Sequence, residues 1–237
     1  MTTLRRLLPH VMMNLRELGG YPTRDQKATR FRRFLRGDAP VALQEEDVRY
    51  LENYGVAMVI DMRSPDELVA QPNCLANLPG IDYRPIPFTD DFTLFADLRY
   101  SPHTHFVPVL KGQHRVKEIF EAMGECPSGK AVYFHCAVGK DRTGIVSCLL
   151  LRLAQVYDED IKADYQVSYT YIQKYIDAMV KLFMQTDSAQ PGLCRTEPEW
   201  IEPLLQFIDE SGGIEQYLLS LGISETCLLN LKARLCE

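Results

Sequence analysis

Hydrophobic residues along the chain form short continuous runs in some places and follow a helical spacing in others. Residues 56–60 and 131–134 are short apolar runs with β-branched or aromatic side chains, which is typical of buried strands. Residues 44–54 and 107–123 carry apolar side chains three or four positions apart, as in helices that pack on a sheet. Residues 145–156 are apolar on nearly every face and predict a helix inside the protein. The order strand, helix, strand, loop and helix predicts an α/β fold with a largely parallel central sheet flanked by helices.

The remaining segments predict a sheet edge and a helical C-terminal third. Residues 83–88 are extended, and their two prolines place them at the edge of the sheet or at the end of a strand. Residues 158–185 contain neither glycine nor proline and predict one long helix or two. Further helices are expected over residues 199–209, over residues 214–221, and from the N-cap Ser224 to Leu235. We expect a single domain over residues 1–237, in which residues 158–192 are a candidate helical lid.

The overall composition is that of an ordinary soluble protein, with 46% hydrophobic and 24% charged residues. No apolar stretch is long enough to span a bilayer, so stable membrane insertion is not expected. Residues 1–20 lack the continuous apolar core of a secretory signal. The seven cysteines are irregularly spaced and odd in number, which indicates reduced thiols. A cytoplasmic location is therefore expected, although export without a signal peptide would leave no trace in the sequence.

Residues 135–144 connect the apolar run 131–134 to the buried helix and therefore form a strand-to-helix turn. The free backbone N–H groups at such a helix start, together with the positive end of the helix dipole, bind anions. Gly139 and Gly144 would let the backbone turn tightly and approach a ligand.

Two side chains of this turn add chemistry to the anion site. Cys136 is expected to be a thiolate near neutral pH, because the helix start favours negative charge. Arg142, six residues later, supplies a planar cation that matches two oxygens of a phosphate. A nucleophile, an anion cradle and a guanidinium clamp are the parts required for phosphoryl transfer to sulfur without a metal. We therefore expect neither a metal nor a cofactor, and we interpret His103, His105 and His114 as ordinary loop residues.

The sequence His-Cys-x5-Arg-Thr-Gly resembles the phosphate loop of cysteine-dependent protein tyrosine phosphatases. The fuller string His-Cys-x-x-Gly-Lys-Asp-Arg-Thr-Gly resembles their atypical, mostly microbial branch, which acts on phosphotyrosine, phosphoserine, phosphothreonine and phosphoinositides. Residues 14–21 resemble the Asn-aromatic-Arg-Asp-Leu-Gly-Gly-Tyr entry of that branch, with Leu15 and Glu17 as departures, and are expected to brace the loop. Residues 61–64 resemble its strand ending in Asp-Leu-Arg-Ser, so we expect Asp61 and Arg63 to form a structural pair.

The resemblance implies a role for each position of the loop. The thiolate of Cys136 would attack phosphorus, and Arg142 would hold the equatorial oxygens. His135 would fix the loop and the sulfur, and the Thr143 hydroxyl would donate a hydrogen bond to the sulfur. The expected substrate-binding residues are Ala137, Val138, Gly139, Lys140, Asp141 and Arg142.

The general acid is harder to assign. Classical tyrosine phosphatases use an Asp on a mobile loop before the cysteine, but this chain has no Trp-Pro-Asp, and its only tryptophan is Trp200. We favour Asp141 slightly, although this carboxylate could instead orient the arginine of the loop. Asp90, Asp91 and Asp97 are the alternative acids by position.

Charge along the chain bears on the substrate. The net charge is −6, but residues 1–36 hold nine Lys or Arg against two acidic residues. Such a segment steers an anionic ligand or a lipid surface rather than nucleic acid, or it is a solvated face paired to acidic neighbours. The run 30–36 is a candidate rim of the pocket. Lys140 suits a substrate with more than one phosphate, or else it is solvated or paired with Asp141.

The expected function is phosphomonoester hydrolysis through a cysteinyl-phosphate intermediate. The expected partner is a phosphorylated protein or a phosphoinositide, without nucleic acid, and the oligomeric state stays open. An inositol polyphosphate phosphatase and a phosphate-binding module without catalysis are the alternatives, and rhodanese-like sulfur transfer is a more distant one. The intact Cys136 and Arg142 argue against the non-catalytic alternative.

Overall fold

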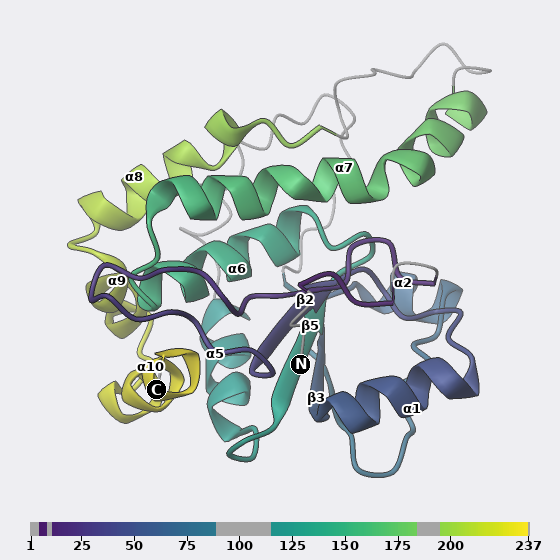
Figure 1. Ribbon diagram of the computed structural model, residues 1–237, viewed down its shortest axis with the longest axis horizontal. Coiled ribbons are helices and arrows are strands. Elements are labelled where there is room, and N and C mark those ends of the chain that lie inside the picture. The colour runs from purple at the N-terminus through teal and green to yellow at the C-terminus, as the bar shows by residue number, and fades with distance from the viewer. Residues whose placement is uncertain (1–4, 9–10, 89–114, 184–194, 237) are drawn as a thin grey trace.

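A five-stranded sheet forms the centre of the computed structural model, which describes residues 5–8, 11–88, 115–183 and 195–236 (Figure 1). The strand order is β1-β2-β5-β3-β4; β1 runs antiparallel to β2, and all other neighbouring strands are parallel. The strands are β1 (Arg16–Glu17), β2 (Phe34–Gly37), β3 (Val56–Asp61), β4 (Asp82–Pro85) and β5 (Ala131–His135). The predicted α/β fold with a largely parallel sheet is confirmed, as is the position of the proline-containing β4 at the edge.

Helices cover both faces of the sheet, with α1 on one side and α5, α6 and α10 on the other (Figure 1). The central strand β5 shows why, because its side chains alternate between two separate cores. Val132 and Phe134 belong to the core beneath α5 and α6, whereas Ala131 and Tyr133 belong to the core beneath α1. The helices among the described residues are α1 (Glu45–Tyr54), α2 (Pro65–Ala70), α5 (Arg115–Glu125), α6 (Asp141–Leu153), α7 (Asp158–Phe183), α8 (Glu202–Glu210), α9 (Ile214–Ser220) and α10 (Glu225–Cys236), with a 3-10 turn at Pro198–Trp200.

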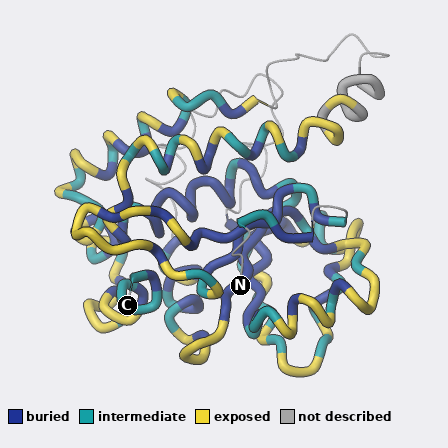
Figure 2. Tube along the Cα trace, in the orientation of Figure 1, coloured by how far each residue is buried: buried dark blue, intermediate teal, exposed yellow. Residues whose placement is uncertain are grey.

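The helix predictions hold with small shifts. The buried character of α6 is confirmed, since nearly every residue from Arg142 to Leu153 is inaccessible to solvent (Figure 2). Gly55 ends α1 at a φ of 102°, and Ser224 caps α10 by accepting a hydrogen bond from the Cys227 N–H at 3.2 Å. The segment from residue 158 forms one helix rather than two. The predicted start of α5, at residues 107–114, lies outside the described residues.

The prediction that residues 30–36 form a rim of the pocket is wrong. Phe34–Gly37 is β2, a strand within the sheet between β1 and β5, and its Arg36 is fully buried. Arg33 lies at the opposite end of β2 from the loop after β5, because the two strands are parallel. Among the described residues, no helix is long and apolar enough to cross a membrane.

Candidate active site

The loop that follows β5 lies at the C-terminal edge of the parallel strands, where ligand sites of α/β sheets are found. Cys136 is the first residue after β5 and is only 2% exposed. The Thr143 hydroxyl, on the first turn of α6, donates a hydrogen bond to Cys136 Sγ at 3.2 Å. The sulfur therefore lies at the helix start with a hydroxyl donor already on it.

The first two carbonyls of the loop are held by hydrogen bonds from neighbouring residues. The Cys136 carbonyl lies 2.9 Å from His135 Nδ1, and since a carbonyl only accepts, Nδ1 carries the proton. The Ala137 carbonyl accepts from the Ala39 N–H, also at 2.9 Å. Burial lowers the pKa of His135, so the ring is neutral and its other nitrogen accepts from Asn73 Nδ2 at 2.9 Å.

The next two carbonyls of the loop accept hydrogen bonds from the side chain of Asn14. Its Nδ2 donates to the Val138 carbonyl and to the Gly139 carbonyl, each at 2.9 Å. Arg16 fixes this amide in turn, because its Nη1 donates to Asn14 Oδ1 at 2.6 Å. The segment that the sequence predicts to brace the loop therefore does so through side-chain hydrogen bonds to its backbone.

These contacts decide where the backbone N–H groups of the loop point. In a trans peptide the N–H points away from the preceding carbonyl, and the described chain contains no cis peptide. With the carbonyls of residues 136–139 held outward, the N–H groups of residues 137–140 face the opposite, inner side. Within the described part of the chain, the N–H groups of Ala137, Val138 and Gly139 donate to no other residue. The result is a ring of free donors, which is an anion site.

A buried ion network supports the ring. Arg36 donates from Nη2 to the Gly139 carbonyl at 2.8 Å and also pairs with Asp164 of α7. Arg16 Nε contacts the same carboxylate at 3.0 Å. Burial alone would raise the pKa of Asp164, but the two guanidinium groups lower it. The Asp164 carboxylate on α7 thus links β2 and the N-terminal segment to each other beneath the loop.

The close approach of the loop to β2 explains Gly139. Its φ of +70° disfavours other L-residues, and a Cβ at this position would lie 2.3 Å from the Gly37 carbonyl oxygen. Any larger residue would push the loop away from the strand on which it rests.

Arg142 is held by Glu67, a residue that the sequence analysis does not assign to the site. Its Nη1 and Nη2 contact the two carboxylate oxygens of Glu67 at 2.7 and 2.8 Å, and Nη1 also donates to the Met62 carbonyl at 3.2 Å. Burial alone would lower the pKa of Arg142, but Glu67 and the charge at Cys136 raise it. Burial alone would likewise raise the pKa of Glu67, and Arg142 lowers it. The guanidinium is therefore a fixed cation beside the sulfur.

Glu67 is itself fixed by a capping box at the start of α2. The Ser64 hydroxyl accepts from the Glu67 N–H at 3.1 Å, and Glu67 Oε2 accepts from the Ser64 N–H at 2.7 Å. The Ser-x-x-Glu pattern at residues 64–67 is the signal from which this helix start could have been predicted. It would not have shown which arginine the carboxylate contacts.

The expected structural pair of Asp61 and Arg63 is confirmed. Arg63 donates from Nε and Nη2 to the two oxygens of Asp61 at 2.9 and 2.7 Å. Asn73 links this pair to His135, because its Nδ2 lies 3.0 Å from Asp61 Oδ2 and 2.9 Å from the ring. Burial alone would raise the pKa of Asp61, but a positive charge on His135 at acid pH and the contact with Arg63 lower it to about 2. This network therefore fixes the position of His135, the residue immediately before the nucleophile Cys136.

Lys140 and Asp141 form a pair at the start of α6. Lys140 is 4% exposed, and its Nζ lies 3.5 Å from Asp141 Oδ2 and 3.5 Å from the Arg195 carbonyl. Of the alternatives left open by the sequence, the structure shows the paired lysine rather than the solvated one. Asp141 Oδ1 is buried and has no hydrogen-bond partner in the described part of the protein. It is also Glu67, and not Asp141, that holds the loop arginine in a two-oxygen contact.

A small cavity with both polar and apolar lining opens beside the loop. Its volume is about 160 Å³, and it is lined by Ala137 and Val138 together with apolar side chains of two other segments and of α7. The apolar side chains are Val11, Met13, Val41, Leu43 and Tyr175, and Asp38 and Gln71 also line the cavity. An apolar group next to a bound phosphate would be accommodated here.

The other candidates lie elsewhere. Asp90, Asp91 and Asp97 fall outside the described residues, as do His103, His105 and His114. Among the residues that are described, no group of three His, Cys, Asp or Glu side chains is placed to hold a metal ion.

Comparison with known proteins agrees with this geometry. The sequence model of the tyrosine phosphatase family matches residues 9–237. A tyrosine-protein phosphatase of Nostoc commune is 30% identical over 210 residues, which cover 81% of this chain and 70% of that protein. A putative tyrosine-protein phosphatase of Cupriavidus necator is 28% identical over 220 residues, which cover 86% of this chain and 80% of the relative.

Proposed function

Since the chain belongs to the tyrosine phosphatase family, and is thereby a protein-tyrosine phosphatase, we propose that it hydrolyses phosphotyrosine through a cysteinyl-phosphate intermediate on Cys136. The observation that carries this proposal is the position of the sulfur. Cys136 Sγ accepts from the Thr143 hydroxyl beside a ring of inward-facing N–H groups, with the fixed Arg142 cation next to it. An anion bound in the ring would have its phosphorus in front of the nucleophile.

In the first step, the sulfur attacks phosphorus as the bond to the tyrosine oxygen breaks. The N–H groups of residues 137–140 and Arg142 stabilise the charge on the three equatorial oxygens. Because the carbonyls behind these N–H groups are already held by Asn14, Arg36 and Ala39, the ring needs little rearrangement during the reaction. This preorganisation is the main contribution of the scaffold to the rate.

In the second step, water attacks phosphorus and the sulfur leaves. The Thr143 hydroxyl donates to the departing thiolate and makes it a better leaving group. Asp141 is the favoured proton donor for the first step and acceptor for the second, because its Oδ1 is not engaged by any described residue and it sits at the start of α6. Asp90, Asp91 and Asp97 remain the alternative acids.

Phosphotyrosine is the proposed main substrate because the cavity beside Ala137 and Val138 offers apolar side chains for an aromatic ring, together with polar groups for its neighbouring residues. Phosphoserine, phosphothreonine and phosphoinositides are proposed as further substrates on the likeness of the loop to the atypical branch. The pairing of Lys140 with Asp141 weakens the case for a lysine reserved for a second phosphate. An inositol polyphosphate phosphatase is therefore the second candidate, and it would show its highest turnover on soluble inositol phosphates.

The proposal treats the whole chain as one phosphatase domain. Asp164 of α7 contacts Arg16 and Arg36, so the N-terminal segment, the sheet and the helical third support one loop. The first half of α7 is packed, with Ile161 and Tyr165 almost fully buried. A lid role within residues 158–192 therefore stays a proposal for the part after this packed half, of which residues 184–192 lie outside the described residues.

The test is turnover of an aryl phosphate and of a phosphotyrosine peptide by Cys136→Ser and Arg142→Ala. Both variants should lose at least about a thousandfold in turnover, because one lacks the nucleophile and the other the fixed cation. Cys227→Ser is the matched control, since this partly buried thiol lies on α10 and should leave activity unchanged. Substantial turnover by Cys136→Ser would contradict the mechanism, and tight phosphate binding without turnover by the unchanged protein would favour the non-catalytic alternative.

A further inference from the structure

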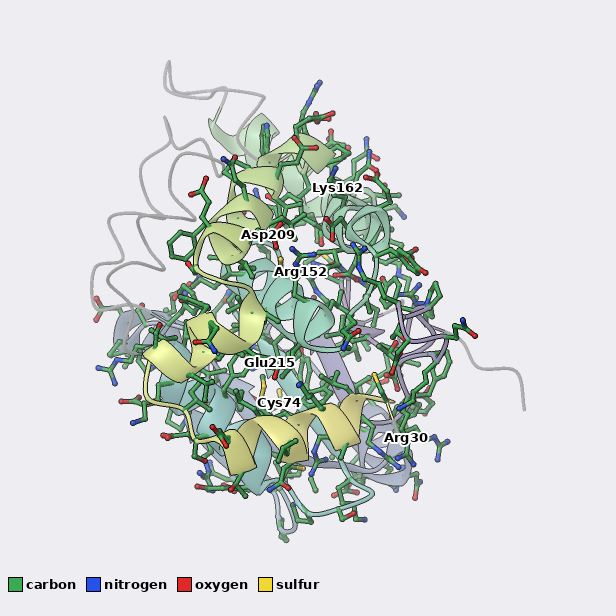
Figure 3. All side chains as sticks on the ribbon, turned by 90° about the vertical axis from the view of Figure 1, so that its left-hand side faces the viewer. Arg30, Cys74, Arg152, Lys162, Asp209 and Glu215 are labelled. Carbon is green, nitrogen blue, oxygen red and sulfur yellow. The ribbon has the colours of Figure 1, made fainter. Side chains whose placement is uncertain are left out.

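Three arginines meet at the end of the sheet opposite the catalytic loop. Arg33 immediately precedes β2, Gly129 lies two residues before β5, and both strands run from here toward the loop. Arg234 belongs to the last turn of α10, and the Arg30 N–H donates to the Leu235 carbonyl at 2.7 Å. Figure 3 shows Arg30 beside the end of α10. Segments far apart in the sequence thus bring three cations to one place.

These arginines line a cavity of about 450 Å³. Its lining is mainly polar and includes Ser128, Asn230 and Gly129. A volume of this size lies within the range of small-molecule sites, on the order of 300–1,000 Å³. The cavity could hold a phosphorylated sugar or a nucleotide, but it is polar enough to disfavour an apolar ligand.

Within the described part of the protein, none of the three arginines forms an ion pair with a carboxylate, and Glu17 acts on Arg33 only through its more distant charge. Arg33 Nη1 donates to the Arg32 and Gly129 carbonyls at 2.8 and 3.0 Å. Arg234 donates to the carbonyls of Lys130 at 2.8 Å, Pro127 at 3.2 Å and Cys126. These bonds orient the guanidinium groups without compensating their charge.

The neighbouring charges repel one another. Burial lowers the pKa of Arg33, and the like charges of Arg30 and Arg234 lower it further. The arrangement is unusual in a protein with a net charge of −6, where acidic partners are abundant. A bound anion would remove this repulsion.

We propose that the cavity between Arg30, Arg33 and Arg234 is a second anion site, which binds a small molecule carrying at least two negative charges on phosphate groups. Guanidinium forks match phosphate oxygens in pairs, and Ser128 and Asn230 supply hydrogen bonds for the hydroxyl groups of such a ligand. The site lies apart from the catalytic loop, so it binds without being cleaved. The same headgroup chemistry is available free in solution or on a lipid.

Calorimetric titration with pyrophosphate tests the proposal. The experiment uses the Arg142→Ala protein, in which the catalytic loop lacks its cation, so that anion binding at the loop is weakened relative to binding at the second site. One pyrophosphate should still bind, and adding Arg30→Glu should weaken that binding at least tenfold. The side chain of Arg30 is exposed and has no described partner, so the substitution should not impair folding, and thermal melting would verify this.

Arg49→Glu is the control for the same change of two charge units, because this arginine is exposed on α1, which packs on the opposite face of the sheet from α10. It should change pyrophosphate affinity less than twofold. Sedimentation with vesicles containing a phosphoinositide distinguishes the sources: vesicle binding lost in Arg30→Glu would indicate a lipid headgroup, and binding of pyrophosphate alone would indicate a free ligand. Absence of pyrophosphate binding in Arg142→Ala, or equal affinity with and without Arg30→Glu, would overturn the proposal.

Hydrolysis of an aryl phosphate distinguishes the second site from the catalytic site. Arg30→Glu in the otherwise unchanged protein should hydrolyse an aryl phosphate at the unchanged rate. Loss of aryl phosphate turnover together with loss of pyrophosphate binding would show that the arginine acts on the catalytic loop, and would overturn the claim of a separate site.

Discussion

The arginines at the two ends of the sheet have different kinds of partner. At the C-terminal end, each buried arginine contacts a carboxylate: Arg16 and Arg36 contact Asp164, Arg63 contacts Asp61, and Arg142 contacts Glu67. At the N-terminal end, Arg30, Arg33 and Arg234 have carbonyl partners or none among the described residues. In the first arrangement, the carboxylate fixes the position of the guanidinium group but offsets part of its positive charge. In the second, the guanidinium groups keep most of their positive charge but are held less firmly in position.

The difference matters because position and charge serve different purposes. A catalytic guanidinium must lie within a fraction of an ångström of a reacting oxygen, and a two-oxygen contact to a carboxylate secures this. A binding site for a mobile anion requires uncompensated charge more than it requires fixed geometry. We therefore expect substitutions at the C-terminal end to disturb stability and turnover, and those at the N-terminal end to disturb binding alone.

The largest effect is expected from Asp164→Ala. It leaves Arg16 and Arg36 buried without their carboxylate, and breaking a buried pair in this way costs about 3–5 kcal/mol of unfolding free energy. Urea denaturation of the two proteins measures the loss. Asp209→Ala is the control, because Asp209 is 61% exposed and Arg152 keeps Asp158 as a partner, so the pair should contribute about 0–1 kcal/mol. Similar losses in both variants would mean that the buried ion pairs at the loop contribute no more to the unfolding free energy than the pair with Asp209 does.

A smaller effect on folding, but a large one on turnover, is expected from Glu67→Gln. The amide keeps the shape of the side chain but cannot offer two charged oxygens to Arg142, so the cation loses its fixed position. We expect kcat/KM on an aryl phosphate to fall about 100-fold. Asp66→Asn on the same first turn of α2 is exposed and should have no effect. An undiminished kcat/KM in Glu67→Gln would show that Arg142 is positioned without the carboxylate.

Acid should weaken the fold through Asp61. Its pKa of about 2 in the folded protein lies below the ordinary 3.8, so the group stabilises the fold above pH 4 and loses this contribution as the pH falls from about 4 to about 2. The difference corresponds to about 2 kcal/mol. Urea denaturation at several pH values should show a smaller acid dependence in Asp61→Asn than in the unchanged protein. An identical slope in both would exclude Asp61 as the source.

The smallest effect is expected at the other end of the sheet. Arg30→Ala removes one of three like charges and an exposed side chain, so the unfolding free energy should rise or stay within about 0.5 kcal/mol of its value. Thermal melting at low salt, where repulsion is screened least, is the most sensitive measurement. A clear drop in the melting temperature would show that Arg30 is structural, and the contrast between the two ends of the sheet would fail.

How far the sequence predicts the structure depends on how local each signal is. The apolar run of β5, the apolar α6 and the turn between them are properties of adjacent residues, and all three are found as expected. β2 escapes prediction because its arginine looks like a surface residue until Asp164, 128 positions later in the chain, is known to lie beside it. Glu67 escapes for the same reason, since its partner Arg142 is 75 positions away.

The sequence by itself determined the alternating α/β order and the loop that carries Cys136, because both follow from the spacing of side chains over a few residues. Only the tertiary structure decided which carboxylate holds which arginine, how the carbonyls behind the loop are turned outward, and that the basic run of residues 30–36 is divided between the two ends of the sheet. The physical reason is that ion pairs and hydrogen bonds depend on distances between segments, and the order of strands sets those distances.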